Sequence, residues 1–336
     1  MTTKVAINGF GRIGRLVLRA LVETKRDDIE IVAINNLASV ESNAHLFKYD
    51  SVHGRFNGEV RVEGDDIIIN GMKVRDVTCP DPLNLPWKEL DVDIVMECSG
   101  RFTKRNEAAK HLEAGAKKVL ISAPGQDEDI TVVYGVNHQE LKACHVIVSN
   151  ASCTTNCLAP VAAVLDKTIG IKHGFMTTIH SYTGDQNILD ASHKDMHRAR
   201  AACMSMIPTS TGAAKAVGKV LPQLAGKLQG TAIRVPTPNV SVVDLSFVAK
   251  KDTSVEEIQN AMRAAASEGP LKGILGVYDE PLVSTDFNHD PHSSIFALNE
   301  VSVIDGTFVR VLSWYDNEWA FSIRMLDTAA AMMAAV

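Results

Sequence analysis

The sequence is poor in the features that mark membrane, secreted and nucleic-acid-binding proteins. Its 336 residues contain no apolar run that approaches the roughly 20 residues needed to cross a bilayer. Lys and Arg number 34 against 40 Asp and Glu, and this net charge of −6 argues against nucleic acid as the main partner. The N-terminus from Met1 to Lys4 lacks the basic and apolar regions of a signal peptide. We therefore expect a cytoplasmic protein with no membrane partner.

Cysteine is scarce as well, with 6 residues in the whole chain. This number is too small for a disulfide framework in a chain of this length, and cytosolic thiols stay reduced. Cys153 and Cys157 lie close in sequence, but no second Cys/His pair stands near them, so we expect no metal site. One of the cysteines can still be catalytic.

Low-complexity linkers and internal repeats are also missing, and the composition is that of a globular protein, with 46% hydrophobic and 22% charged residues. A chain of 336 residues is too long for most single cores and fits two domains of ordinary size.

Short apolar strands alternate with amphipathic helices over the first 150 residues. This alternation predicts a parallel sheet covered by helices on both faces. Residues 67–74 differ, because Asn70-Gly71 between apolar segments predicts an antiparallel hairpin. We expect strands at Lys4–Asn8, Ile29–Asn35, Asp93–Glu97, Lys117–Ser122, Val132–Val136 and Val146–Asn150, and helices at Gly11–Glu23 and Lys104–Ala114.

From about Ser152 the pattern changes to long strands with fewer helices, which predicts an α+β domain with a mainly antiparallel sheet. Residues 184–206 form a long irregular segment, and such segments are usually functional or lie at interfaces. Asn317 is expected to cap a C-terminal helix. The other elements expected here are helices at Cys153–Lys167, Ala213–Leu221 and Ser254–Ala266, and strands at Gly174–Tyr182, Thr231–Val235, Ser241–Lys250 and Phe308–Tyr315.

A glycine-rich turn follows the first expected strand. The segment from Gly9 to Gly14 reads G-x-G-x-x-G and opens a helix, which is the context of a Rossmann-type dinucleotide site. The glycines allow a tight turn and close approach to a pyrophosphate, and the helix N-terminus supplies free amides. The alternative is a glycine-rich turn that binds no ligand.

The same fingerprint calls for an acidic residue about 20 positions further on, where it binds the ribose 2′-hydroxyl. Counting 22 residues from Gly14 leads to Asn36, an amide. An amide can bond the hydroxyl and does not repel a 2′-phosphate, so NAD is expected and NADP is not excluded. Asn36 can also be a simple turn residue.

Cys153 stands where an expected strand ends and a helix begins. The dipole and the unpaired amides of a helix N-terminus favour a thiolate, which is the nucleophilic form of cysteine, and the same amides can hold an oxyanion. Cys157 lies one turn further along and is expected to be a small core residue. His180, at the end of an alternating strand, is a candidate base for Cys153, with a structural histidine as the alternative.

The chain resembles the phosphorylating glyceraldehyde-3-phosphate dehydrogenase family along essentially its whole length. The resemblance implies two domains, a dinucleotide-binding domain of residues 1–151 joined by helix 317–336, and a catalytic domain of residues 152–316. The matching motifs are Asn8–Arg15, Ala151–Pro160, His180–Gln186, Pro208–Lys215, Arg234–Asn239 and Trp314–Trp319.

The reaction implied by this resemblance is the reversible conversion of D-glyceraldehyde 3-phosphate to 1,3-bisphosphoglycerate. Cys153 would attack the aldehyde and His180 would take the hydroxyl proton as hydride leaves for the nicotinamide. Inorganic phosphate would then release the acyl group from the thioester. Covalent storage of the acyl group couples oxidation to phosphorylation. The resemblance also implies a homotetramer, in which residues 184–206 lie next to a neighbouring subunit's cofactor site.

The resemblance carries roles to further positions in this sequence. Thr183 and Arg234, with Arg198 nearby, would bind the substrate's phosphate. The implied site for inorganic phosphate comprises Ser152, Thr154, Thr211 and Gly212. The implied cofactor residues are Gly9, Gly11, Arg12, Ile13, Gly14, Asn36, Ser99, Gly100, Ser122 and Asn317, the last of which would hold the nicotinamide carboxamide.

Two departures from the family pattern bear on the cofactor. Most NAD-specific relatives carry aspartate where this chain has Asn36, and they tend to carry Leu-Pro where it has Ala191-Ser192. Small, polar residues at that pair occur in NADP-accepting members. Both departures predict that NADP is used besides NAD.

Three alternatives compete with this interpretation. Erythrose-4-phosphate dehydrogenase shares the scaffold, but the chain keeps Tyr182-Thr183-Gly184 and the run from Thr209 to Lys215, which that sister family replaces. A semialdehyde or acyl-phosphate reductase would not match the long motifs outside the active site. A non-enzymatic binding role, as a secondary activity, has no docking patch in the sequence to support it.

Overall fold

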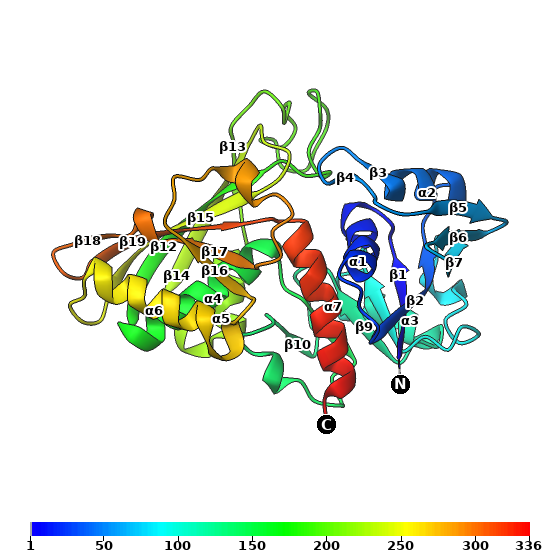
Figure 1. Ribbon diagram of the computed structural model, residues 1–336, viewed down its shortest axis with the longest axis horizontal. Coiled ribbons are helices and arrows are strands. Elements are labelled where there is room, and N and C mark those ends of the chain that lie inside the picture. Colours follow the sequence, from blue (N-terminus) through cyan, green and yellow to red (C-terminus); the bar gives the residue numbers. More distant parts are fainter. Residues whose placement is uncertain (1) are drawn as a thin grey trace. The chain divides into compact units, whose positions relative to one another are not determined.

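The computed structural model describes residues 2–336 and divides into two compact units (Figure 1). The first unit runs to Val132 and adds His138–Ser152 and Phe321–Val336. The second comprises Val133–Asn137 and Cys153–Ala320. The first contains a largely parallel sheet and the second a largely antiparallel sheet, which confirms the expected fold class.

The first unit is built on a nine-stranded sheet of order β10-β11-β9-β8-β1-β2-β7-β6-β5. The strands from β10 to β7 in this order pair in parallel, and the hairpin strands β6 and β5 continue the sheet antiparallel. Asn70 and Gly71 both adopt positive φ in the β6–β7 turn, as the Asn-Gly signal predicts. The strands are β1 (Thr3–Asn8), β2 (Ile29–Asn35), β5 (Val60–Glu63), β6 (Asp66–Ile69), β7 (Met72–Val77), β8 (Ile94–Glu97), β9 (Lys118–Ile121), β10 (Ile130–Thr131) and β11 (Ile147–Ser149). A small separate hairpin joins β3 (Tyr49–Asp50) to β4 (Gly54–Arg55).

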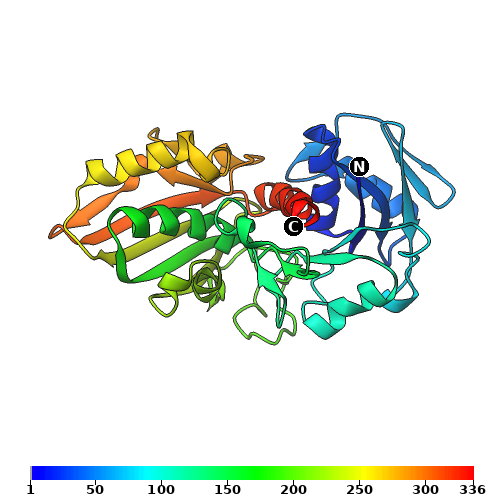
Figure 2. The same ribbon diagram turned by 90° about the horizontal axis from the view of Figure 1, so that it is seen from below.

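Helices cover both faces of this sheet. Ala108 of α3 (Arg105–Glu113) packs on Val119 and Ile121, whereas Gly14 of α1 (Arg12–Glu23) lies against Ile7, which points to the other face. Helix α7 (Trp319–Ala334) runs beside α1 (Figures 1 and 2), and Asp327 of α7 forms an ion pair with Arg26, which follows α1. Helix α2 (Val40–Lys48) is not predicted from the sequence. It begins after Ser39, whose side chain accepts a hydrogen bond from the Ser42 amide.

The second unit is built on an eight-stranded sheet of order β13-β14-β12-β15-β19-β17-β16, with β18 paired to β19. Helices α4 (Cys153–Thr168), α5 (Ala213–Val220) and α6 (Val255–Ser267) lie on one face of it (Figure 1). In β12, Met176, Thr178 and His180 are buried on one face of the sheet, while Phe175 is exposed on the other. The strands are β12 (Ile171–Ser181), β13 (Ile207–Ser210), β14 (Leu228–Val235), β15 (Ser241–Ala249), β16 (Leu275–Tyr278), β17 (Ser294–Ala297), β18 (Ser302–Ile304) and β19 (Phe308–Tyr315).

Two sequence expectations are wrong. The strand expected at Val132–Val136 is a turn, because the Asn137 side chain accepts the Val133 amide at 2.8 Å and closes it. The C-terminal helix is capped by Asp316, whose carboxylate accepts the Glu318 and Trp319 amides at 2.9 and 2.8 Å. The side chain of Asn317 does not cap the helix and instead forms hydrogen bonds with Ser181 and Ser241.

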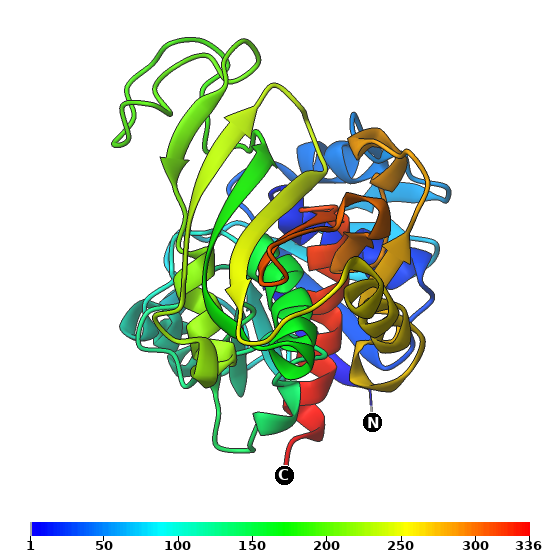
Figure 3. The same cartoon turned by 90° about the vertical axis from the view of Figure 1, so that its left-hand side faces the viewer.

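The segment between β12 and β13 contains no helix or strand and projects past the sheet (Figure 3). Five of its apolar side chains are exposed, namely Ile188, Leu189, Met196, Met204 and Met206. No helix among residues 2–336 is long and apolar enough to cross a membrane.

Candidate active site

Cys153 and His180 face each other in the second unit. Cys153 is the first residue of α4, and its Sγ lies 3.5 Å from Nε2 of His180 near the end of β12. The other ring nitrogen, Nδ1, is 2.8 Å from the Ser181 carbonyl oxygen, which can only accept. The imidazole proton is therefore on Nδ1, and the lone pair of Nε2 points at the sulfur. This arrangement lets His180 accept a proton from the thiol.

The pKa values of the two groups describe a neutral pair. The pKa of His180 falls to about 3, mainly through burial and then through the charge of Arg234. Burial raises the pKa of Cys153, while Arg234 and Thr154 act in the opposite direction. Backbone amides at the start of α4 also lower this pKa, which is the direction expected at a helix N-terminus, but desolvation of the sulfur is the larger effect. His180 Nε2, at 3.5 Å from the sulfur, is positioned to accept the proton of Cys153.

Tyr315 joins the elements that carry these two residues. Its hydroxyl lies 2.8 Å from Thr154 Oγ1 in α4 and 2.9 Å from Thr178 Oγ1 in β12. Its ring meets the His180 ring edge to face, with centroids 5.9 Å apart. Thr154 therefore uses its hydroxyl to position the helix. Cys157 is fully buried, as expected for a core residue, and burial raises its pKa to about 12.

Arg234 and Thr183 are also brought together. Arg234 on β14 stands beside His180 in the parallel register, and its Nη1 donates to the Ser181 carbonyl at 3.0 Å and to Thr183 Oγ1 at 3.3 Å. Its Nε is buried without a hydrogen-bond partner among residues 2–336, and no carboxylate there forms an ion pair with it. A half-buried guanidinium without a counter-ion suits an anionic ligand.

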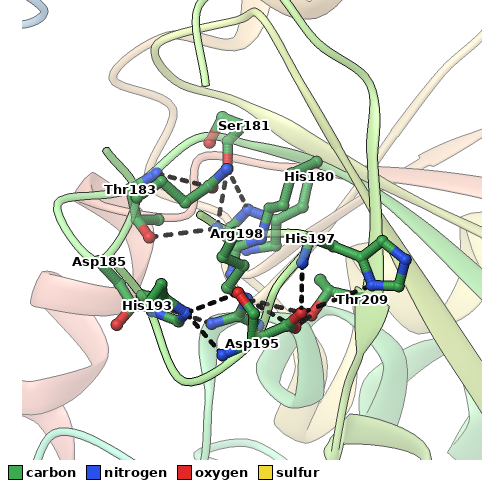
Figure 4. Close-up of polar contacts among 11 residues, drawn as sticks. His180, Ser181, Thr183, Asp185, His193, Asp195, His197, Arg198 and Thr209 are labelled. Atoms are coloured by element: carbon green, nitrogen blue, oxygen red, sulfur yellow. Dashed lines mark hydrogen bonds and ion pairs between the residues drawn. The ribbon is translucent and has the colours of Figure 1, made fainter. Parts of the chain in front are cut away.

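Arg198, by contrast, is already paired. Its Nη1 donates to Asp185 at 2.6 Å and its Nε to Thr209 Oγ1 at 3.1 Å, with Asp195 3.7 Å away. Figure 4 shows these residues gathered around the guanidinium, together with His193, whose Nε2 lies 3.5 Å from Asp185. Arg198 therefore has less free charge to offer an anion than Arg234.

The residues expected at the inorganic phosphate site lie at or next to helix N-termini. Ser152 directly precedes Cys153, and Thr154 lies in the first turn of α4. Gly212 is the N-cap of α5, and Thr211 Oγ1 accepts the Ala213 amide at 3.2 Å. The positive end of the helix dipole makes both termini suitable for an anion.

Asn317 is held by two serines. Its Oδ1 accepts from Ser181 Oγ at 2.8 Å and from Ser241 Oγ at 2.9 Å. The amide nitrogen makes no hydrogen bond with any residue in the range 2–336, so Asn317 presents a donor. This orientation suits a ligand carbonyl, and neither serine was found from the sequence.

The glycine-rich turn of the first unit fits a closely approaching ligand. Gly9 has φ of +94°, and a Cβ there would overlap the backbone of Ser99. A Cβ on Gly14 would overlap the Gly9 carbonyl, so this glycine allows α1 to pack against the turn. A Cβ on Gly11, the N-cap of α1, would meet nothing within 4 Å. The open space at Gly11 leaves the helix N-terminus accessible, as a bound pyrophosphate requires.

A cavity of about 270 Å³ opens beside this turn and is lined by four of the expected cofactor residues, Gly9, Gly11, Asn36 and Ser99. Gly100 follows Ser99 with positive φ. The Ser122 amide donates to the Glu97 carbonyl at 3.0 Å, which places Ser122 at the same sheet edge. Arg12 instead forms a two-point ion pair with Asp50, at 2.5 and 3.2 Å, and Ile13 is half-buried in the first turn of α1.

Asn8 and Asn35, which line the cavity, and the buried Glu97 are not among the residues that the sequence predicts for the site. Glu97 accepts from Asn8 Nδ2 at 2.5 Å, and Asn8 Oδ1 accepts from Asn35 Nδ2 at 2.6 Å. Glu97 also accepts from the Ser99 amide at 2.8 Å and from its hydroxyl. The only sequence signal was a polar residue at the end of each of three apolar strands.

Comparisons with known proteins agree with this geometry. Residues 3–105 match the family described as glyceraldehyde 3-phosphate dehydrogenase, NAD binding domain, and residues 152–317 match its C-terminal domain. A glyceraldehyde-3-phosphate dehydrogenase of Xanthobacter flavus is 67% identical over 332 residues, covering 99% of each chain. Those of Cereibacter sphaeroides and Geobacillus stearothermophilus are 64% and 59% identical over 333 and 332 residues, covering 99% and 98% of each chain. These matches, together with the Cys153–His180 pair and the glycine-rich turn, establish that the chain belongs to the glyceraldehyde-3-phosphate dehydrogenase family.

Proposed function

We propose that the enzyme oxidises and phosphorylates D-glyceraldehyde 3-phosphate, reversibly, to 1,3-bisphosphoglycerate. The observation that carries this proposal is the pairing of Cys153 Sγ with the free lone pair of His180 Nε2 beside Arg234, a cation without a carboxylate partner. Bound NAD supplies the hydride acceptor. This activity places the enzyme in glycolysis and, in reverse, in gluconeogenesis.

The chain's own residues account for the covalent steps. Cys153 attacks the aldehyde carbon as its proton passes to His180, and His180 returns this proton to the former carbonyl oxygen, which gives a thiohemiacetal on the sulfur and a neutral imidazole. His180 then takes the hydroxyl proton as the carbon is oxidised, which leaves a thioester on Cys153. Inorganic phosphate attacks the thioester carbon, and the C–S bond breaks to release the acyl phosphate and the thiolate. The amides at the start of α4 are placed to stabilise the oxyanion of each tetrahedral species.

Two anion subsites complete the catalytic part of the proposal. Arg234 and Thr183, with Arg198, bind the phosphate that the substrate already carries. Ser152, Thr154, Thr211 and Gly212 bind inorganic phosphate. The pairing of Arg198 with Asp185 supports Arg234 as the main source of positive charge for the substrate.

The cofactor residues are proposed from the glycine-rich turn and the cavity beside it. Gly9, Gly11 and Gly14, with Arg12 and Ile13, shape the pyrophosphate site. The adenosine ribose lies by Asn36, and Ser99, Gly100 and Ser122 line the same sheet edge. Asn317, with its oxygen held by two serines, donates to the nicotinamide carboxamide. NADP remains a proposed second cofactor.

We assign these roles to two domains. Residues 1–151 with helix 317–336 form the dinucleotide-binding domain, and residues 152–316 form the catalytic domain. The domain families that match residues 3–105 and 152–317 support this division.

The enzyme is further proposed to be a cytoplasmic homotetramer. The exposed apolar side chains of residues 182–206 support an interface between subunits, because large exposed apolar patches mark association sites. Analytical ultracentrifugation tests the assembly, and a monomer at micromolar concentration would contradict it.

Assays with the two candidate sugar phosphates test the reaction. We expect NAD reduction with D-glyceraldehyde 3-phosphate that depends on added inorganic phosphate, and little activity with erythrose 4-phosphate. Relatives that are 56–67% identical carry the glyceraldehyde-3-phosphate dehydrogenase name, which favours this substrate. Phosphate-independent turnover of erythrose 4-phosphate as the faster reaction would overturn the proposal.

A further inference from the structure

We propose that Asp76 and Asn43 are positioning residues that fix the Asn36 amide with its oxygen toward the nucleotide cavity, and that they thereby favour NAD over NADP. The inference rests on the proposed placement of the adenosine ribose beside Asn36. It concerns residues to which neither the glycine fingerprint nor the family motifs assign a role.

Three side chains form a continuous chain of hydrogen bonds from the sheet to the cavity. Asn43 in α2 is buried, and its Nδ2 donates to Asp76 Oδ2 on β7 at 2.7 Å. Asn43 Oδ1 accepts from Asn36 Nδ2, also at 2.7 Å. Asn36 directly follows β2, and its backbone amide donates to the Val77 carbonyl at 3.0 Å, which holds its backbone to the end of β7.

The chemistry of the three groups fixes the direction of this chain. A carboxylate can only accept, so Asn43 must turn its NH₂ group toward Asp76. The carbonyl oxygen of Asn43 then faces Asn36, and an acceptor in that position requires the NH₂ group of Asn36. Burial raises the pKa of Asp76 to about 6, so the carboxylate is ionised at neutral and alkaline pH.

The orientation of the Asn36 amide decides which of its atoms is available to a ligand in the nucleotide cavity. Asn36 lines it, and Asn36 Oδ1 accepts no hydrogen bond from any residue in the range 2–336. The oxygen is thus the atom left for a ligand. A ribose 2′-hydroxyl can donate to it, whereas a 2′-phosphate brings only acceptor oxygens at neutral pH and meets a partial negative charge.

A second hydrogen-bond chain of the same construction reaches the same cavity, which Asn8 and Asn35 line. Glu97 fixes Asn8, and Asn8 fixes Asn35, whose Oδ1 accepts the Cys79 amide at 2.9 Å. In both chains a buried carboxylate sets the orientation of two asparagines that would otherwise be free to turn over. The amide of Asn36 therefore acts as the carboxylate of NAD-specific sites does, as an acceptor, although it carries no charge.

The test compares the wild type with Asp76→Asn and Asn43→Ala, each as the full chain at pH 8. Asparagine at position 76 can donate as well as accept, so the direction of the hydrogen-bond chain is no longer fixed. Asn43→Ala removes the side chain that connects Asp76 to Asn36. Dissociation constants for NAD and NADP are measured by calorimetry, and KM and kcat are measured separately with each cofactor. The matched control is Asp66→Asn, since Asp66 is a carboxylate of the same sheet whose Oδ1 has no hydrogen-bond partner among residues 2–336 and whose Oδ2 pairs with Lys73 and not with an asparagine.

We expect the ratio of the NADP to the NAD dissociation constant to fall about fivefold to tenfold in Asp76→Asn and Asn43→Ala, as the loss of one oriented hydrogen bond implies. The change should appear in KM and not in kcat, and Asp66→Asn should keep the wild-type ratio. In an Asn36→Asp background both side-chain oxygens at position 36 are acceptors whatever the hydrogen-bond chain does. Adding Asp76→Asn should therefore leave the ratio of the two dissociation constants unchanged.

Equal weakening of both cofactors, or the same fall in ratio in the Asn36→Asp background, would overturn the inference in favour of a purely structural role. An unchanged ratio in both variants would overturn it as well. Asn36→Ala separates this failure from a wrong ribose placement. If Asn36→Ala binds NAD as the wild type does, the placement is wrong. If it binds NAD more weakly while Asp76→Asn has no effect, the placement stands and the positioning role is refuted.

Discussion

Trp87 donates its indole N–H to Nδ1 of His111 at 3.0 Å inside the core of the first unit. An indole can only donate, so the proton of the imidazole is on Nε2, which lies 3.1 Å from the Glu97 carboxylate. Both His111 and Glu97 are fully enclosed. This pair thus supports the carboxylate from which the chain of asparagines under the nucleotide cavity begins.

Trp87→Phe should destabilise the first unit, because it leaves Nδ1 of His111 buried without a partner. An unsatisfied buried polar atom costs about 1–3 kcal/mol, in addition to the lost ring volume. Urea unfolding of the variant measures the loss. The control is Trp314→Phe, which removes a half-buried hydrogen bond to Tyr278 and should cost less. An equal or smaller loss at Trp87 would show that the contact with His111 contributes nothing.

Cys153→Ser should abolish turnover while sparing the cofactor. A serine hydroxyl is a far weaker nucleophile, so we expect kcat to fall by at least roughly a thousandfold. NAD affinity, measured by calorimetry, should change less than about twofold, since the glycine-rich turn is untouched. Full activity in this variant would refute the covalent mechanism.

The buried neutral imidazole of His180 should make the enzyme acid-sensitive. Its pKa is about 3 in the folded protein and 6.5 in an ordinary environment, so between these pH values the unfolded chain binds a proton that the folded chain does not. Stability therefore falls as the pH falls from 6.5 toward 3, by up to about 1.4 kcal/mol per pH unit from this group, and the group contributes nothing above 6.5. The free energy of unfolding of His180→Gln should depend less steeply on pH in this range. Parallel curves for the two proteins would contradict the pKa shift.

Arg234→Met should weaken binding of the substrate phosphate. The guanidinium has no carboxylate partner among residues 2–336, and a charged hydrogen bond contributes about 1.5–3 kcal/mol, so the KM for D-glyceraldehyde 3-phosphate should rise roughly tenfold to a hundredfold. Arg200→Met is the control, since Arg200 is exposed and already paired with Asp190 at 2.9 Å. A similar KM in both variants would show that Arg234 does not bind the substrate phosphate.

The two glycines of the nucleotide turn should respond differently to alanine. Gly9→Ala strains a positive φ and forces a methyl group into the Ser99 backbone. We therefore expect a loss of stability of about 2–4 kcal/mol and also a loss of cofactor binding. Gly11→Ala has room for its methyl group and should fold normally but bind NAD more weakly. Thermal unfolding and calorimetry separate the two effects. If Gly11→Ala binds NAD with wild-type affinity, no ligand approaches that position.

Local signals in the sequence determined much of this protein. A strand, the glycine-rich turn Gly9–Gly14 and a helix follow one another within about twenty residues. Asn70-Gly71 specifies the hairpin between β6 and β7. Cys153 was identified as a nucleophile because it starts a helix, which depends only on neighbouring residues. Such features are predictable because the residues that create them are adjacent in the chain.

Only the tertiary structure decided what these groups can do. The register of β12 with β14 sets His180 beside Arg234, and burial of the site raises the pKa of Cys153. The sequence predicts an Asn36 amide that does not repel a 2′-phosphate, but Asp76, forty positions away, dictates which of its atoms faces the cavity. Protonation, desolvation and amide orientation depend on partners that are distant in sequence, and these partners meet only when the sheets form.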